Sequence, residues 1–240
     1  RYFHYATDVP IRNHYAFFSA AYAVHEGRWN DTSIEIFHHP THAWNVDRMV
    51  RSTQASLDYY TDHFGPYQHK QVRIIEFPGY ERFAQAFPNT IPYSEAIGFV
   101  ARIEKPEDID YVFYVTAHEM AHQWWAHQVI GAQMQGATVL SETLSQYSAL
   151  MVMEKEYGKE FRWPVLAALG YDAAQVALKA LDTAKSMEAE AVRDALEAVD
   201  GIKTISATPA KPYGPKDHEC LDREHVFLGD WKDGAVVRLK

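Results

Sequence analysis

The amino-acid sequence predicts an α+β fold, and three observations support this prediction. Short runs of aromatic and β-branched residues, bounded by Gly and Pro, are typical of strands and occur mainly before residue 104. Two long segments that follow, 111–129 and 138–157, have the length and apolar spacing of helices. A hydrophobic content of 47% over 240 residues is sufficient to form a globular core.

The chain is expected to open with a pair of strands. Residues 15–24 and 33–38 are rich in aromatic and β-branched side chains. Between them, residues 27–30 have the sequence Gly-Arg-Trp-Asn, which is typical of a turn that joins paired strands. The opening of the chain is therefore predicted to be sheet.

A helix and two more strands are expected next. Residues 47–64 place apolar side chains near helical spacing and are followed by Gly65 and Pro66, which favour a helix end. Strands are predicted at 71–77 and 96–103, on either side of a loop that contains Pro and Gly at 78–92. The two long helices then follow, joined by the segment 131–136, and Gly158 is expected to cap the second.

The composition changes near Trp163 and Pro164. Thirteen of the fifteen Tyr and eleven of the thirteen His precede residue 160, whereas the segment 166–199 is rich in Ala. We therefore expect two regions, 1–162 and 163–240. The second is predicted to be a mixed α/β segment, with helices at 172–181 and 187–199 and strands at 225–231 and 235–239 around Asp233 and Gly234.

The charge balance excludes some classes of partner. With 23 basic and 32 acidic residues, the formal net charge of −9 disfavours binding to nucleic acid or to an anionic membrane surface. Cys220 is the only cysteine, so the chain forms no internal disulfide. The chain begins at Arg1 without an initiating Met, a signal peptide or a bilayer-spanning apolar run, and we expect it to be an excised piece or a fusion.

The segment His118-Glu119-Met120-Ala121-His122 carries the clearest chemical signal. Residues four apart lie on one face of a helix, so the two imidazoles can converge on one zinc ion at about 2.0–2.1 Å. Glu119 is offset around the helix, so its carboxylate is expected to reach a metal-bound water as general base. This spacing predicts a hydrolytic zinc site.

A simpler interpretation is that His118 and His122 are hydrogen-bonded helix residues and that Glu119 is merely exposed. The flanking apolar residues argue against it, because two buried imidazoles need partners. A metal ion would supply them. The apolar residues are Val112, Phe113, Val115, Trp124 and Trp125.

Glu142 is the natural third zinc ligand. Hydrolytic zinc sites commonly use three protein ligands, and the nineteen residues between His122 and Glu142 allow one helix to end and an antiparallel one to begin. Ser141 is expected to be the N-cap of this second helix. The alternative is an ordinary acidic residue favoured by the helix dipole. Glu154 and Glu156 are weaker rivals because they lie three turns further along the helix.

The remaining histidines are expected to have other roles. His127 follows His122 by five residues and should face away from the clamp, at the surface or behind the ligands. His38, His39 and His42 cluster at the end of a strand and in a loop, where adventitious metal binding competes with a plain solvated loop.

Residues 118–125, followed by Glu142, resemble the gluzincin aminopeptidases of the M1 family. More narrowly, the segments 68–77, 88–95 and 135–142 are similar to a bacterial branch of that family, in which the peptidase domain is fused to membrane segments of an ABC-transporter type. The resemblance covers about residues 1–160. It implies a thermolysin-like gluzincin catalytic domain, one Zn²⁺ ion, a peptide substrate with a free N-terminus, and permease-like membrane segments in the parent protein.

The same resemblance implies a role for Glu95, at the position where M1 enzymes keep a glutamate that binds the substrate's α-amine. The alternative is a plain loop carboxylate. The residues around Glu95 differ from the usual Gly-Ala-Met-Glu-Asn pattern, and Glu142 lies one residue later than the ligand of the best-known M1 enzymes.

The tail resembles a different family. Residues 169–174, 191–196 and 225–234 look like the C-terminal segment of type I periplasmic branched-chain amino-acid binding proteins. If so, the region where M1 enzymes keep an oxyanion-stabilising tyrosine is replaced, and only Tyr171 and Tyr213 follow Tyr157. Three functions remain open: a zinc aminopeptidase, a zinc-bound but weak or inert fold, and a solute-binding module.

Overall fold

The structure is a computed structural model of residues 1–240, and it divides into two compact units, Arg1–Arg162 and Trp163–Lys240. Each unit is described by itself. The residues described are 2, 4–7, 9–105, 108–133, 137–158, 165–204, 211–216, 229–232 and 235–238, with side chains omitted at 165–169 and in the last two ranges.

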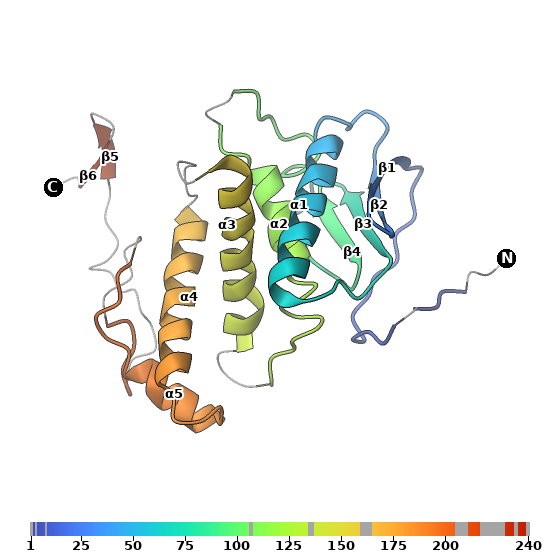
Figure 1. Ribbon diagram of the computed structural model, residues 1–240. Coiled ribbons are helices and arrows are strands. Elements are labelled where there is room, and N and C mark those ends of the chain that lie inside the picture. The colour runs from blue at the N-terminus through green and yellow to red at the C-terminus, as the bar shows by residue number, and fades with distance from the viewer. Residues whose placement is uncertain are drawn as a thin grey trace. The chain divides into compact units, whose positions relative to one another are not determined.

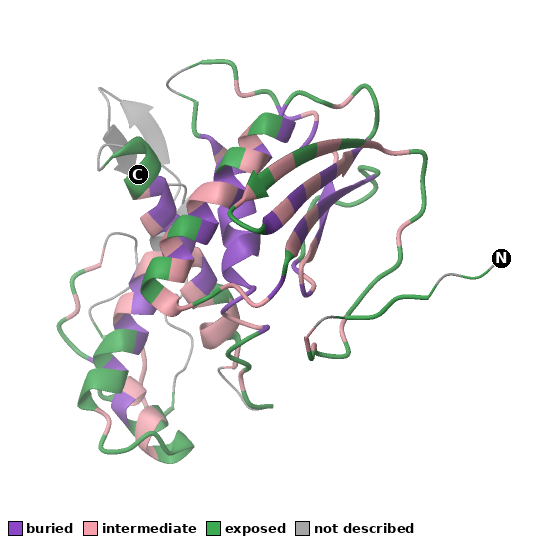
Figure 2. Ribbon diagram, turned by 45° about the vertical axis from the view of Figure 1, so that its right-hand side comes forward, coloured by how far each residue is buried: buried purple, intermediate pink, exposed green. Residues whose placement is uncertain are grey.

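A four-stranded sheet forms one layer of the first unit, with the strand order β1-β2-β3-β4 (Figure 1). β1 (Ala23–Trp29) and β2 (Thr32–His38) form an antiparallel hairpin, while β3 (Gln71–Phe77) and β4 (Thr90–Ser94) add in parallel. Buried and partly buried residues alternate along β2, as the burial view shows (Figure 2). This period of two indicates that one face of the hairpin covers the core.

The first predicted strand was placed too early, because β1 covers residues 23–29 rather than 15–24. Gly27 lies inside this strand and not in the turn, which is formed by Asn30 and Asp31. A Cβ atom on Gly27 would come within 2.6 Å of Cγ1 of Val50 on the adjacent helix. Gly27 is therefore explained by close packing of the helix against the strand.

The prediction of a strand at 96–103 was wrong, and β4 instead lies at the end of the predicted loop and just beyond it. The side-chain amide of Asn45 donates hydrogen bonds to the carbonyl oxygens of Gly98 and Ala101, at 2.7 and 2.8 Å. These bonds hold the chain in turns after β4. The strand at 71–77 is confirmed with the predicted bounds.

Three helices form the second layer of the first unit (Figure 1). α1 (Val46–Phe64) confirms the predicted helix and packs against α2 (Tyr111–Ala121), which packs in turn against α3 (Leu144–Tyr157). α2 ends eight residues before the predicted bound of 129. The predicted helix at 138–157 is confirmed, but its first turn is π-helical, η1 (Val139–Thr143), and Gly158 caps its end with φ 80°. Nine of the eleven residues of α2 are buried.

Asp110 connects all three helices. Its Oδ1 atom caps α2 by accepting the N–H of Phe113 at 2.9 Å, and its Oδ2 atom accepts Nε of Arg48 on α1 at 2.7 Å. The hydroxyl of Tyr157 on α3 donates to the same Oδ2 atom at 2.8 Å. This largely buried carboxylate therefore fixes how the helix that carries His118 packs.

We expect Asp110→Ala to lower the free energy of unfolding by about 3 kcal/mol, because it removes an N-cap and leaves a partly buried guanidinium without its carboxylate. Denaturant unfolding followed by circular dichroism measures this change. Asp62→Ala is the matched control, since its side chain is 82% exposed, and it should change the free energy by less than about 0.5 kcal/mol. Equal losses in the two variants would contradict the role given to Asp110.

The second unit contains α4 (Val165–Thr183), α5 (Ala189–Glu197) and an antiparallel pair, β5 (Gly229–Lys232) and β6 (Ala235–Arg238). These elements confirm both predicted helices and the described parts of both predicted strands; the turn at 233–234 and residues 225–228 and 239 lie outside the described residues. Val176, Ala180, Ala195 and Val199 form a small core, against which Tyr213 packs. In the part of the chain that the structure describes, no helix has the length and apolar character needed to cross a membrane.

Candidate metal centre

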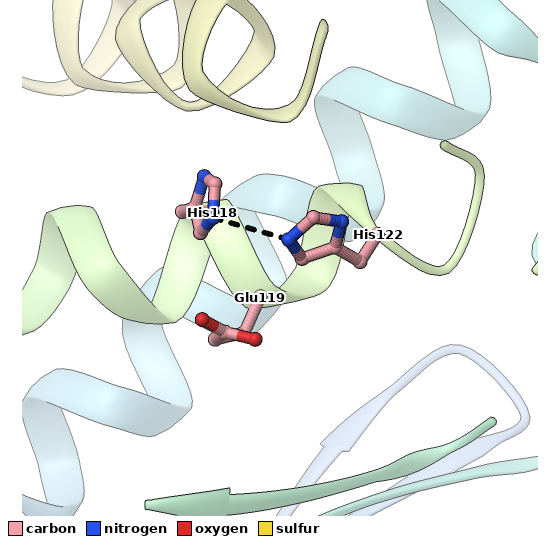
Figure 3. A group of neighbouring side chains, drawn as sticks. All are labelled: His118, Glu119 and His122. Atoms are coloured by element: carbon pink, nitrogen blue, oxygen red, sulfur yellow. Dashed lines mark hydrogen bonds between the residues drawn. The ribbon is translucent and has the colours of Figure 1, made fainter. Parts of the chain in front are cut away.

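His118 and His122 lie one turn apart at the end of the buried helix α2, and their Nε2 atoms are 3.1 Å from each other (Figure 3). His122 is the residue that caps the helix and still has helical dihedral angles. Both side chains are only about a tenth exposed. The i,i+4 spacing predicted from the sequence is therefore present, with two imidazole nitrogens facing each other.

Glu142 faces the same two nitrogens from the π-helical turn η1. Its Oε2 atom is 3.4 Å from Nε2 of His118 and 3.6 Å from Nε2 of His122. Ser141, predicted as an N-cap, instead lies inside η1. The π-helical turn lets Glu142 and, on α3, Ser145 both reach the end of α2, and such turns are frequent at functional sites.

These three atoms fit the coordination of a metal ion. Ligands at about 2.0–2.1 Å in tetrahedral directions lie roughly 3.3 Å from one another, and the separations here are 3.1, 3.4 and 3.6 Å. If both Nε2 atoms carried a proton, the two N–H groups would repel each other. If neither carried one, no hydrogen bond could form between them. A shared cation satisfies both imidazoles and the carboxylate.

Two polar partners orient the ring of His122. Its Nδ1 atom lies 3.0 Å from the Ser145 hydroxyl and 3.2 Å from the carbonyl oxygen of Trp125. With the proton on Nδ1, the imidazole donates to that carbonyl and presents an unprotonated Nε2, as a metal ligand requires. Nδ1 of His118 is buried with no hydrogen-bond partner among the described residues.

Glu119 lies beside this group, and one oxygen of its carboxylate is within 4.8 Å of the ligand nitrogens of both imidazoles. Its Oε2 atom is buried without a hydrogen-bond partner among the residues described. Burial raises the pKa of Glu119, and the neighbouring imidazoles only partly offset this effect. A carboxylate with a raised pKa, next to the candidate metal ligands, is suited to accept a proton during hydrolysis.

A cavity of about 380 Å³ opens onto these residues. It is lined by His118, Glu119, His122 and Glu142, together with the segment 83–86, Ala126, His127 and Ser141. Arg12 and His14, from the segment before β1, complete the lining. No local sequence pattern indicates these two residues, because they lie in a segment without regular structure and reach the cavity only through tertiary contacts. None of the described residues that line the cavity is a tyrosine.

The N-terminal segment is attached to the rim of this cavity. Nη1 of Arg12 donates to the carbonyl oxygen of Ala126 at 3.2 Å, and the ring of His14 stacks on Phe87 at 4.3 Å. His127 is buried, and its Nε2 atom lies 3.0 Å from the carbonyl oxygen of Ala86. Burial lowers the pKa of His127 to about 4. His127 is thus a neutral wall residue outside the metal group.

Glu95 is not among the residues that line the cavity, and the structure does not bring it to the two imidazoles. Its Oε1 atom accepts the backbone N–H of Gly79 at 2.8 Å, and its Oε2 atom lies 3.8 Å from Nδ1 of His42. The contact of Glu95 with a substrate amine stays a prediction from the family resemblance. Of the two rival ligands, Glu156 pairs with Arg51 on α1, with 3.3 Å between its Oε1 atom and Nε of the arginine.

His122 and Glu142 each shift the pKa of the other. The imidazoles of His118 and His122, 3.4 and 3.6 Å from its Oε2 atom, hold the pKa of Glu142 far below its usual range. Burial acts to lower the pKa of His122, but Glu142 and Glu119 outweigh it, and the net shift is upward. In the metal-free protein, a proton therefore competes with a metal ion for His122.

This competition predicts a pH dependence of metal binding. The raised pKa of His122 means that its imidazole gains a proton earlier as the pH falls, so zinc affinity should fall on acidification through that pKa. We expect the apparent affinity to drop roughly tenfold for each pH unit and displaced proton. Competition with a chromophoric chelator at several pH values measures it. An affinity independent of pH between about 8 and 6, around the ordinary His pKa of about 6.5, would contradict this assignment.

Comparison with known proteins places this geometry in context. Residues 48–206 match the family model described as the peptidase family M1 domain. The match covers about two thirds of the chain, begins in α1, includes α2, η1 and α3, and extends into the second unit. No curated protein matches the chain.

Proposed function

The chain belongs to peptidase family M1, and from this premise we propose that it is a zinc-dependent peptide hydrolase. In this proposal His118, His122 and Glu142 hold the ion, and Glu119 acts as the general base. The observation that carries it is the convergence of two Nε2 atoms and one carboxylate oxygen within 3.6 Å of one another. Beside them lies the buried carboxylate of Glu119, whose Oε2 atom has no hydrogen-bond partner among the described residues.

Each residue contributes a distinct step. A zinc ion bound here would act as a Lewis acid that lowers the pKa of water towards about 7 and polarises the scissile carbonyl. Glu119 accepts the proton of the attacking water on its carboxylate and returns it to the leaving amine. Ser145 and the Trp125 carbonyl hold His122 in the tautomer that keeps Nε2 unprotonated.

The finer proposal is aminopeptidase activity, and it rests on the family resemblance rather than on an amine-binding residue in the cavity. The cavity wall at 83–86 carries no carboxylate, and Glu95 points elsewhere. A zinc-bound but weakly active protein is the second candidate. The absence of tyrosine among the described cavity residues favours it, because loss of one oxyanion donor costs about 10²–10³ in rate.

Two further proposals concern the relationship of the chain to other proteins, and they do not depend on the metal site. The bacterial branch fused to transporter-type segments and the solute-binding-like tail rest on sequence resemblance alone. The family match reaches residue 206, so it overlaps the first part of that tail. If the tail acts as a solute-binding module, the chain is expected to bind amino acids without added zinc.

A substrate pair tests the proposed function. We expect slow hydrolysis of an aminoacyl-peptide that stops when zinc is removed with a chelator and returns when zinc is restored. The same peptide with an acetylated N-terminus is the matched substrate. Cleavage of the free peptide alone supports the aminopeptidase proposal, equal cleavage of both supports a peptidase without amine recognition, and turnover that survives chelation would contradict the zinc proposal.

A further inference from the structure

A second group of metal-ligating side chains lies outside the cavity. It comprises His42, from the loop after β2, Glu76 on β3, and Glu95, directly after β4. One ligand atom from each residue lies within 4.8 Å of the ligand atoms of the others. We propose that these three residues form a second divalent-metal site, separate from the catalytic group, that fastens the loop after β2 to the ends of β3 and β4.

The geometry is close to that of a three-ligand site. Nδ1 of His42 lies 2.5 Å from Oε1 of Glu76 and 3.8 Å from Oε2 of Glu95. Ligands of one ion would lie roughly 3.3 Å apart. On binding, the distance from His42 to Glu76 would therefore increase by about 0.8 Å, and the distance from His42 to Glu95 would decrease by about 0.5 Å. Rotations of the side chains are sufficient, and Nδ1 releases its proton to solvent when it binds the ion.

Backbone contacts already hold both carboxylates in place. The backbone N–H of His39 donates to Oε2 of Glu76 at 2.5 Å, which leaves Oε1 directed at His42. The N–H of Gly79 donates to Oε1 of Glu95 at 2.8 Å, which leaves Oε2 on the side of His42. A Cβ atom on Gly79 would lie 3.1 Å from Oε1 of Glu95, so glycine permits this close approach. One oxygen of each carboxylate therefore remains for an ion.

The charge of the group favours a dication. Two carboxylates share a single imidazole, and among the described residues neither Glu76 nor Glu95 forms an ion pair with Lys or Arg. The Glu76 side chain is only 4% exposed, so its charge is poorly screened. A divalent ion on neutral His42 and the two carboxylates gives a net charge of zero. Like charges in such a site otherwise repel each other.

The ligand set indicates the class of ion and its role. One imidazole and two carboxylates suit a borderline divalent ion such as zinc, rather than the all-oxygen sites of calcium or magnesium. His42 and Glu95 are 25% and 33% exposed, which provides a path for the ion to enter. No residue placed as a general base borders this group, so the ion would stabilise the fold.

Zinc stoichiometry in a variant without the catalytic ligands tests the proposal. We expect the double variant His118→Ala/His122→Ala to retain about one zinc per chain after gel filtration, and addition of Glu95→Gln to remove it. The control is Glu81→Gln in the same double variant, because Glu81 is an exposed carboxylate in the loop between β3 and β4; it should retain the ion. A double variant without zinc, or zinc that survives Glu95→Gln, would overturn the proposal.

Thermal melting provides a second measurement, independent of peptide hydrolysis. Zinc should raise the Tm of the double variant, and this rise should vanish with Glu95→Gln, while the Tm values of the two proteins in chelator remain equal. An equal zinc-dependent rise in both proteins would contradict the site. If the catalytic centre were misassigned, parent and double variant would hold the same amount of zinc, so the two failures are distinguishable.

Discussion

Replacing Glu119 with Gln is expected to abolish peptide hydrolysis and to leave the zinc content equal to that of the parent protein. The amide has nearly the same size as the carboxylate, so it fits the buried position, but it cannot accept a proton. Glu119 lies beside the imidazoles of His118 and His122, whereas the carboxylate oxygen that faces both Nε2 atoms belongs to Glu142. Loss of a general base typically costs about 10²–10⁴ in rate.

Two measurements on Glu119→Gln decide the assignment: the turnover of an aminoacyl-peptide and the zinc content by elemental analysis. Glu154→Gln is the control, because Glu154 lies on α3, about three turns after Glu142, and its replacement should change neither quantity. Loss of zinc from Glu119→Gln would indicate that this residue is a ligand. Turnover close to that of the parent would mean that another group accepts the proton.

The second large effect is expected for His122→Ala, which should lose about one equivalent of zinc relative to the parent and all zinc-dependent hydrolysis. Its Nε2 atom faces both His118 and Glu142, so removal of the ring eliminates one ligand and leaves the other two without a common partner. Loss of one of three ligands removes most of the binding free energy of such a site.

The conservative variant Ser145→Ala distinguishes loss of the His122 ligand from loss of the hydroxyl that orients its ring. It keeps Nε2 of His122 in place but removes the hydroxyl that lies 3.0 Å from Nδ1. We expect zinc to be retained with an affinity roughly 10–100-fold weaker, as is typical when a partner behind a ligand is lost. Undiminished zinc in His122→Ala would show that the ion binds elsewhere. A Ser145→Ala affinity identical to the parent's would show that Trp125 alone orients the ring.

The sequence was sufficient for elements whose signals are local. The helix α1 and the strand β3 have the bounds that their apolar spacing and flanking residues predict, to within one residue. Strand β4 was missed, because a strand is defined by its partners, and the pairing of Thr90–Ser94 with β3 is not visible in its own composition. Gly27 was taken for a turn residue, although only the packing of Val50 explains it.

The candidate site divides in the same way. By itself, the sequence determined that His118 and His122 face one point, because a helix places residues four apart on one face whatever surrounds it. The positions of Glu142, Arg12, His14 and Glu95 were decided by the tertiary structure. A π-helical turn places Glu142 opposite the imidazoles, the N-terminal segment brings Arg12 to the cavity, and the turn after β4 directs Glu95 towards His42. These placements depend on contacts between distant segments, and no local pattern encodes them.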